Sequence, residues 1–201
     1  MRISDLGVTF KFLPLQCYAS IKRNFQPRLL KPEGITIHYI SCKNVTPERP
    51  FNTEFTWRLL HDLNFEPDDR LYDIYDGDKQ FASYHLLIGR DAEPLQLVPF
   101  EFQAYHAGVS EFAGKQFCNR FMIGIAFVGS YEVGPTKVQY AMLARICSFL
   151  ITKFNISTDM IVGHEDIAPG RKKDPHGHGD DAAFSWATLH SLIALELNKA
   201  A

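Results

Sequence analysis

The sequence predicts a single α/β domain in which a mixed central β-sheet is flanked by α-helices. Short runs rich in β-branched residues alternate along the chain with segments whose apolar residues recur at helical spacing. The run FMIGIAFVGS is apolar on both faces, which is typical of a central strand. A chain of 201 residues that is 46% hydrophobic is long enough to bury one sizeable core.

The first 33 residues contain several prolines and are expected to form an irregular N-terminal arm, packed on a domain that spans residues 34–201. That domain opens with the stretch GITIHYIS. Its β-branched side chains alternate between two faces, so we expect a strand over residues 34–41.

The middle of the chain predicts one helix, one loop and three strands. A polar start followed by leucines at helical spacing predicts a helix over residues 51–64. Residues 66–80 are acidic and rich in turn formers, so we expect a long surface loop. Residues 83–100 predict two strands joined at Arg90–Pro94, and the apolar run over residues 121–130 predicts the central strand.

The C-terminal third predicts two helices around one short strand. A capping-box pattern that begins at Thr136 predicts a helix as far as Phe154. Residues 159–166 predict a short strand that leads into the loop GHEDIAPGRKKDPHGHGDD, residues 163–181. Apolar residues at helical spacing predict a last amphipathic helix over residues 186–197.

The charge balance excludes several classes of partner. Lys and Arg number 21 against 23 Asp and Glu, so the net charge is −2 and nothing indicates a nucleic-acid or membrane surface. No apolar run approaches the ~20 residues of a spanning helix. The N-terminus lacks a secretory pattern, so we expect a cytoplasmic protein, or a lysin or effector released without a signal peptide. We also expect a monomer.

The cysteines indicate reduced, structural thiols rather than a disulfide framework or a cysteine-based zinc site, because no C-x-x-C pair occurs. The four are Cys17, Cys42, Cys118 and Cys147.

Two histidines and one carboxylate suit an open zinc site, which takes three protein ligands and leaves the fourth position to water. His38 lies in a strand, His164 follows a short apolar strand, and Asp174 lies in a loop long enough to fold back. The alternative is that His38 is a hydrogen-bonded core histidine and His164 merely ends a strand. His176 and His178 are further candidate donors beside Asp174, so residue chemistry alone leaves the ligand set open.

Three motifs occur in a fixed order: VPFEFQAYHAGVS, CNRFMIGIAFVG and GHEDIAPGRKKDP. With them, the chain from about Gly34 to Trp186 resembles the type 2 N-acetylmuramoyl-L-alanine amidases, the AmpD-like family. This family shares its fold with peptidoglycan recognition proteins and phage amidase-type lysozymes. Residues 1–33 and the insertion HGHGDDAA lie outside the resemblance.

The resemblance implies a zinc-dependent amidase that cuts the bond between the lactyl group of N-acetylmuramic acid and L-alanine, in peptidoglycan or in anhydro-muropeptides. The family's zinc ligands fall on His38, His164 and Asp174, with one zinc per chain. Lys172 matches a lysine near the zinc, where a fixed positive charge would stabilise a developing oxyanion. Arg171 is expected to have a structural role, pairing with a carboxylate or with carbonyls, and His176 and His178 are expected at the rim.

The sequence departs from the AmpD-like pattern at one strand position. The family usually carries a glutamate there as general base, and this chain has Ala126. The stretch SYHLLIGRDAE is instead similar to the recognition-protein and phage-lysozyme branch, in which a tyrosine at the position of Tyr84 works beside the zinc. The resemblance therefore implies that Tyr84 hydrogen-bonds the attacking water or the carbonyl.

Two more positions match residues that line the substrate cleft in relatives. His106 is expected to bind substrate, with structural hydrogen bonding as the equal alternative. Asn119 is expected to orient the sugar or the peptide, unless it caps a loop. The second function class is a non-catalytic muropeptide recognition module, which the absent glutamate favours and the intact ligand set opposes.

Overall fold

The architecture is a mixed sheet flanked by helices, as the sequence predicted, and the sheet has six strands. A computed structural model describes residues 11–12, 25–40 and 83–200. The sheet order is β1-β5-β4-β9-β3-β10, in which β4 and β5 pair antiparallel and every other pair is parallel. The strands are β1 (Lys11–Phe12), β3 (Gly34–Ile40), β4 (Leu86–Ile88), β5 (Pro94–Gln96), β9 (Met122–Val128) and β10 (Ile161–Gly163).

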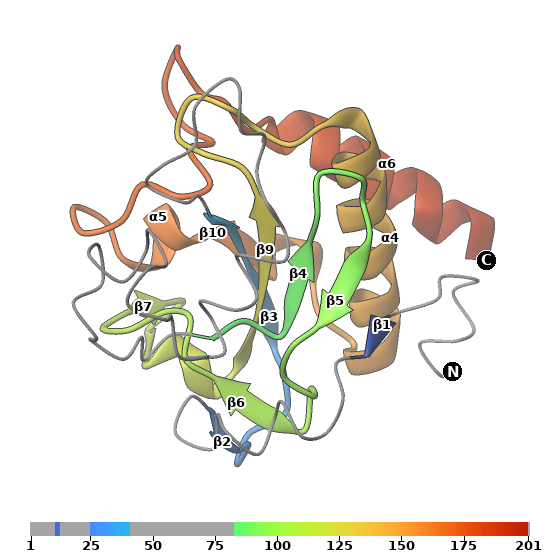
Figure 1. Ribbon diagram of the computed structural model, residues 1–201. Coiled ribbons are helices and arrows are strands. Elements are labelled where there is room, and N and C mark those ends of the chain that lie inside the picture. The colour runs from blue at the N-terminus through green and yellow to red at the C-terminus, as the bar shows by residue number, and fades with distance from the viewer. Residues whose placement is uncertain (1–10, 13–24, 41–82, 201) are drawn as a thin grey trace, which may run out of the picture.

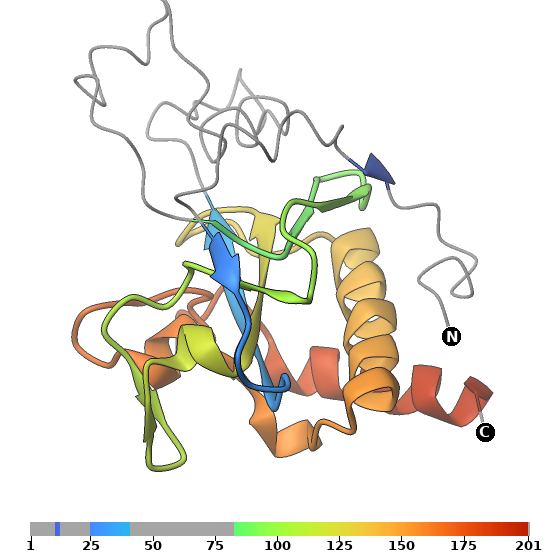
Figure 2. The same cartoon turned by 90° about the horizontal axis from the view of Figure 1, so that it is seen from below.

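The main core lies between this sheet and two helices, α4 (Lys137–Phe154) and α6 (Trp186–Ala200), which lie on the same side of the sheet (Figures 1 and 2). The predicted capping box is present at α4. The Thr136 hydroxyl accepts from the Gln139 amide, and the Gln139 side chain accepts from the Thr136 amide. Because residues along a strand alternate between faces, Ile35 and Ile37 meet the helices and His38 points to the opposite face.

That opposite face carries the short elements that surround the candidate site. They are β6 (Phe102–Ala104), the hairpin of β7 (Glu111–Phe112) and β8 (Lys115–Gln116), the one-turn helix α5 (His164–Ile167) and the 3₁₀ turn Cys118–Arg120. A second 3₁₀ turn, Thr158–Met160, leads into the other end of β10. The strand predicted over residues 159–166 is shorter, Ile161–Gly163, and His164, which was expected to follow it, begins α5. The Asp166 carboxylate accepts the Gly163 amide at 2.6 Å and so fixes the turn from strand to helix.

The N-terminal arm was expected to be irregular, which is wrong for residues 11–12 and 25–27, whereas residues 28–33 form neither helix nor strand. Residues 11–12 pair with β5, and β2 (Phe25–Pro27) pairs antiparallel with β6, so backbone hydrogen bonds tie the arm to the domain. The domain boundary at residue 34 stays a prediction. The predicted helix over residues 51–64 and the loop over residues 66–80 lie outside the described residues.

Two further predictions can be compared with this part of the chain. Cys118 and Cys147 are buried free thiols, as expected, whereas Cys17 and Cys42 fall outside the described residues. No helix among the described residues is long and apolar enough to cross a membrane.

Candidate metal centre and active site

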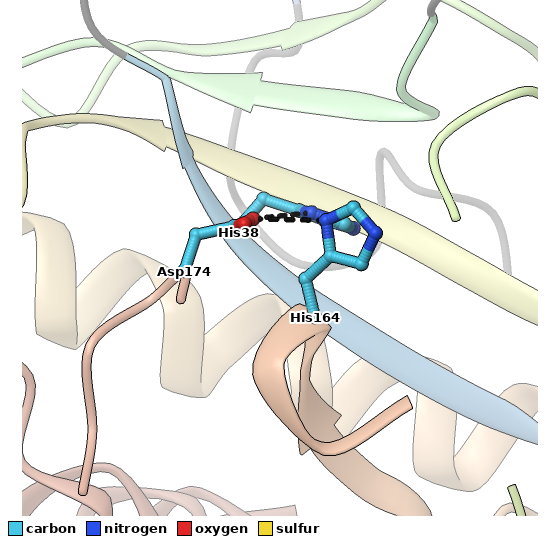
Figure 3. Close-up of side chains that lie close together, drawn as sticks. All are labelled: His38, His164 and Asp174. Atoms are coloured by element: carbon cyan, nitrogen blue, oxygen red, sulfur yellow. Dashed lines mark hydrogen bonds and ion pairs between the residues drawn. The ribbon is translucent and has the colours of Figure 1, made fainter. Parts of the chain in front are cut away.

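His38, within β3, meets two side chains from the C-terminal part of the chain, those of His164 and Asp174. One donor atom from each of His38, His164 and Asp174 lies within 4.8 Å of the others. The Asp174 Oδ2 atom is 2.8 Å from Nδ1 of His38 and 3.2 Å from Nδ1 of His164 (Figure 3). The predicted ligand set is therefore brought together in space.

The fold positions each of these side chains separately. His38 lies within β3, and β10 pairs in parallel with β3, so that Gly163 lies opposite Ile37 and His164 follows directly beside His38. Asp174 reaches the pair from the loop, where its carbonyl accepts the Glu165 amide at 2.8 Å. The loop therefore folds back on α5, as the sequence analysis required.

The hydrogen bonding of His164 orients its ring toward Asp174. Its Nε2 atom lies 3.1 Å from the carbonyl oxygen of Ala107, which can only accept, so Nε2 carries the hydrogen. Its Nδ1 atom then faces the Asp174 carboxylate at 3.2 Å, the arrangement in which both groups can act as ligands of one cation.

The separations fit zinc within about half an ångström. Bonds of about 2.0–2.1 Å in a tetrahedron place donor atoms about 3.3 Å apart, against 2.8 and 3.2 Å between the histidine nitrogens and Asp174 Oδ2. The His38 side chain is fully buried and that of Asp174 is 13% exposed, so one side of the cluster faces solvent.

Burial controls the protonation of the cluster. It lowers the pKa of His38 to about 4, although the hydrogen bond and charge of Asp174 oppose this. Burial alone would raise the pKa of Asp174, but hydrogen bonds with His164 and His38 outweigh it, and the pKa falls below its usual range. The metal-free cluster therefore keeps an ionised carboxylate beside a neutral His38 at neutral pH.

Tyr84 and Ala126 occupy neighbouring space beside His38. Ala126 lies opposite both His38 and Leu87 in the sheet register, so it points to the same face as the candidate ligand. Tyr84 packs against the small cluster that contains Ala126 and Leu87, and its ring centroid is 4.9 Å from that of His38. Burial, followed by the charge of Asp174, raises the pKa of the Tyr84 phenol.

Two cations of the GRKKDP segment lie near the centre. The charge of Lys172 helps to lower the pKa of His38, behind the larger effect of burial, and its side chain is exposed. The Arg171 guanidinium donates to the carbonyls of Ala107 and Val109 at 2.6 and 2.7 Å, which confirms its expected structural role. Arg171 thus ties the loop to the segment that orients His164.

His176 and His178 lie apart from the ligand cluster, within the part of the chain that the structure describes. The His176 ring stacks on Tyr131 at 3.7 Å between centroids, and its Nδ1 atom is 2.9 Å from the Tyr131 carbonyl. His178 pairs with Asp166 at 2.7 Å. Both side chains hold the loop in place.

The two residues expected to bind substrate make internal hydrogen bonds. The Asn119 Oδ1 atom accepts the amides of His106 and Ala107 at 3.0 and 2.8 Å. The His106 ring is buried and its Nδ1 atom lies 3.1 Å from Nε2 of His38. Substrate contact by either residue stays a prediction. Sequence reasoning missed the link between His106 and His38, because no spacing relates a loop residue to a strand 68 positions earlier.

Comparison with known proteins agrees with this geometry. The N-acetylmuramoyl-L-alanine amidase family model matches residues 28–177, most of the chain. The chain belongs to the N-acetylmuramoyl-L-alanine amidase family. The matched range includes His38, His164 and Asp174, the three residues that the fold brings together.

Individual members of this amidase family show how far the likeness extends. The chain is 42% identical over 118 residues to the 1,6-anhydro-N-acetylmuramyl-L-alanine amidase AmpD of Salmonella typhimurium strain SL1344, which covers 59% of this chain and 60% of that protein. It is 42% identical over 115 residues to AmpD of Escherichia coli K12, covering 57% and 60%. These matches thus span about 60% of the curated relatives' length.

Solved structures of the family extend the likeness in fold. A crystal structure of a selenomethionine derivative of AmpD superposes with a TM-score of 0.74 at 31% identity, over 92% of this chain and 94% of that one. The solution structure of Citrobacter freundii AmpD gives a TM-score of 0.60 at 31% identity, over 92% and 91%. The predicted AmpD-like fold is thereby confirmed.

Proposed function

We propose that this protein is a zinc-dependent amidase that hydrolyses the amide bond between the lactyl carboxyl of N-acetylmuramic acid and the L-alanine of a muropeptide. The observation that carries the proposal is the convergence of two histidine Nδ1 atoms on one carboxylate oxygen, with the hydrogen of His164 committed to a carbonyl on its far side. Such a donor set suits one zinc per chain, held by His38, His164 and Asp174.

Zinc, when bound, supplies a Lewis acid that polarises the substrate carbonyl and acidifies water toward a pKa of about 7. The chain's own residues then have distinct tasks. His38 and His164 would offer their Nδ1 atoms to the metal, and Asp174 would offer its Oδ2 atom as an ionised carboxylate. The buried side of the cluster excludes water from behind the ligands, while the 13% exposed Asp174 marks the side open to substrate.

Tyr84 and Lys172 act on the substrate in this proposal. Because its raised pKa keeps the Tyr84 phenol protonated at neutral pH, it can donate a hydrogen bond but is a poor base. We assign its hydroxyl to the carbonyl oxygen on which negative charge develops. Lys172, whose charge already reaches His38, supports the same oxygen electrostatically.

The substrate class follows from the relatives rather than from the site. The AmpD relatives carry the name 1,6-anhydro-N-acetylmuramyl-L-alanine amidase, so soluble anhydro-muropeptides are the proposed substrates, with polymeric peptidoglycan as the competing one. Action as a cytoplasmic monomer is part of this proposal. Cell fractionation and light scattering of the purified chain test it.

A second candidate function is a muropeptide recognition module that binds without cutting. The observation in its favour is Ala126, which faces the same side of the sheet as His38 but offers only a methyl group where the family usually has a carboxylate. The complete ligand set and the neighbouring Tyr84 favour the amidase, because a module that only binds has no need of three converging metal ligands.

One experiment separates these functions and the two substrates. Zinc-loaded protein is incubated with a 1,6-anhydro-muropeptide and, in parallel, with intact sacculi, and the products are identified by mass spectrometry. The matched control is Asp174→Asn, which keeps the side-chain shape but removes the charge of one ligand. We expect one zinc per wild-type chain and release of the free stem peptide from the muropeptide, and neither for the variant. Binding without any cleavage would replace the amidase with the recognition module.

A further inference from the structure

The loop segment His106–Ala107 contacts both histidine ligands from behind. The Nδ1 atom of His106 lies 3.1 Å from Nε2 of His38, and the carbonyl of Ala107 lies 3.1 Å from Nε2 of His164. The His106 ring is only 5% exposed and meets the His38 ring edge to face, with centroids 5.2 Å apart. Two adjacent residues of one loop therefore touch the far nitrogens of both ligands.

The directions of the two hydrogen bonds of His106 follow from the Met122 carbonyl, the acceptor at the end of this series of contacts. The Nε2 atom of His106 lies 3.4 Å from the carbonyl oxygen of Met122, which can only accept, so this nitrogen carries the hydrogen. A neutral His106 ring then has a bare Nδ1 that accepts from Nε2–H of His38. His38 is left with a bare Nδ1, the nitrogen that Figure 3 shows turned toward Asp174.

Neighbouring residues hold the His106–Ala107 segment in this position. Asn119 Oδ1 accepts both of its backbone amides, at 3.0 and 2.8 Å. Gly124 leaves room for the imidazole, because a Cβ atom there would lie 2.4 Å from Cγ of His106. The His106 ring thus leaves no room for a side chain at position 124. The ring also cannot move toward β9, because the backbone of Gly124 lies against it.

We propose that the His106–Ala107 segment is the positioning element of the metal centre, fixing the tautomer and orientation of both histidine ligands. In this view His106 acts through His38 rather than on the substrate, and Asn119 acts through the segment. The inference rests on the proposed zinc site. Partners behind metal-ligating histidines commonly change metal affinity by about 10–100-fold when they are removed.

The test measures zinc affinity by competition with a chromophoric chelator, and the unfolding free energy of the metal-free protein by urea. His106→Phe keeps an aromatic ring but removes the acceptor, and we expect zinc to bind about 10–100-fold more weakly. His106→Asn places an oxygen near the position of Nδ1 and should restore affinity to within a few-fold of wild type. His85→Phe is the comparison variant. His85 is also a buried histidine, but its Nδ1 accepts the Gly124 amide and its Nε2 contacts the Phe102 carbonyl, and its ring meets that of His106 rather than a candidate ligand.

A second pair of variants keeps the proposal testable if His106→Phe fails to fold. Asn119→Asp retains an oxygen acceptor for both amides and should bind zinc nearly as wild type, whereas Asn119→Leu should bind about tenfold or more weakly. Ring-nitrogen NMR of the zinc-loaded wild type gives a direct reading, in which His106 should show a protonated Nε2 and a bare Nδ1.

The outcomes separate this inference from the proposed function. Wild-type protein that binds no zinc would defeat the proposed function itself. If wild type binds zinc and His106→Phe and Asn119→Leu bind it equally well, the positioning role is wrong. Affinity losses that merely follow the stability of the metal-free variants, with the Asn and Asp variants no better than Phe and Leu, would also overturn it, as would a protonated Nδ1 on His106.

Discussion

Replacing Ala126 with glutamate adds a carboxylate to the metal-facing side of β9, in space that is already filled. Ala126 is fully buried, and the cluster around it contains Leu87, Leu95 and the ring of Tyr84. Overpacking a well-packed site costs about 1–3 kcal/mol, and a buried carboxylate without a partner costs several kcal/mol more. We therefore expect Ala126→Glu alone to lose about 3 kcal/mol or more of unfolding free energy.

The magnitude should depend on Tyr84, because Tyr84 packs against the cluster that contains Ala126, and we expect its ring to compete with the glutamate for the same space. In a Tyr84→Ala background the same glutamate gains room and a path to solvent. Residues in contact show coupling free energies of about 0.5–3 kcal/mol, so the cost of Ala126→Glu should fall by at least about 1 kcal/mol in that background.

The assay is urea unfolding of four metal-free proteins: wild type, the two single variants and the double variant. A coupling of about 1 kcal/mol or more, with the double variant more stable than the sum of the single losses predicts, is the expected result. An Ala126→Glu protein as stable as wild type would refute the argument, because it would show that position 126 has free space or water access. Additive losses would show that Tyr84 does not compete for the same volume.

Three further predictions concern turnover and pH. Tyr84→Phe should lower kcat about 10²-fold with zinc content unchanged, since one positioned donor is lost; full activity would remove Tyr84 from the mechanism. Lys172→Met should lower kcat by a similar factor, while the control Lys173→Met should not, and equal effects would contradict a specific role. Burial, followed by the charge of Arg28, lowers the pKa of His85 from 6.5 to about 3, so the unfolded chain binds more protons in that interval. The metal-free protein should therefore lose stability as pH falls below about 6.5. His85→Gln should flatten that slope in urea titrations, and an unchanged slope would show that His85 contributes nothing to it.

The strands and helices that the sequence predicted correctly are those with strong local signals. The alternation of GITIHYI, the apolar run of β9 and the capping box at Thr136 each depend on a few neighbouring residues, and the structure shows all three. Strand β2 in the arm was not predicted, because it forms by pairing with β6, about 75 residues away, and no local pattern in FQP indicates that pairing.

The candidate site divides in the same way. The ligand set followed from a family motif, and the fold then joined His38 to residues 164 and 174 through the parallel register of β3 and β10. The orienting contacts could not be predicted, because they are made by backbone carbonyls and by a loop histidine. A carbonyl has no sequence signature. A glycine inside an otherwise apolar strand indicates that another group approaches the backbone closely. At Gly124 that group is the His106 ring.

Positions 84 and 126 are best considered together, because their side chains pack in one cluster. In the sequence they are 42 residues apart, but the register of β3 and β9 places Ala126 beside His38, and Tyr84 packs against the same cluster as Ala126. A phenol with a raised pKa donates a hydrogen bond and does not take up a proton at neutral pH, whereas a carboxylate does the reverse. Under the proposed function, Tyr84 therefore stabilises the carbonyl oxygen, and the methyl group of Ala126 accepts no proton from water. Tyr84 and Lys172 then serve the same oxygen, and the acidity of the attacking water depends on the metal that His38, His164 and Asp174 are arranged to hold.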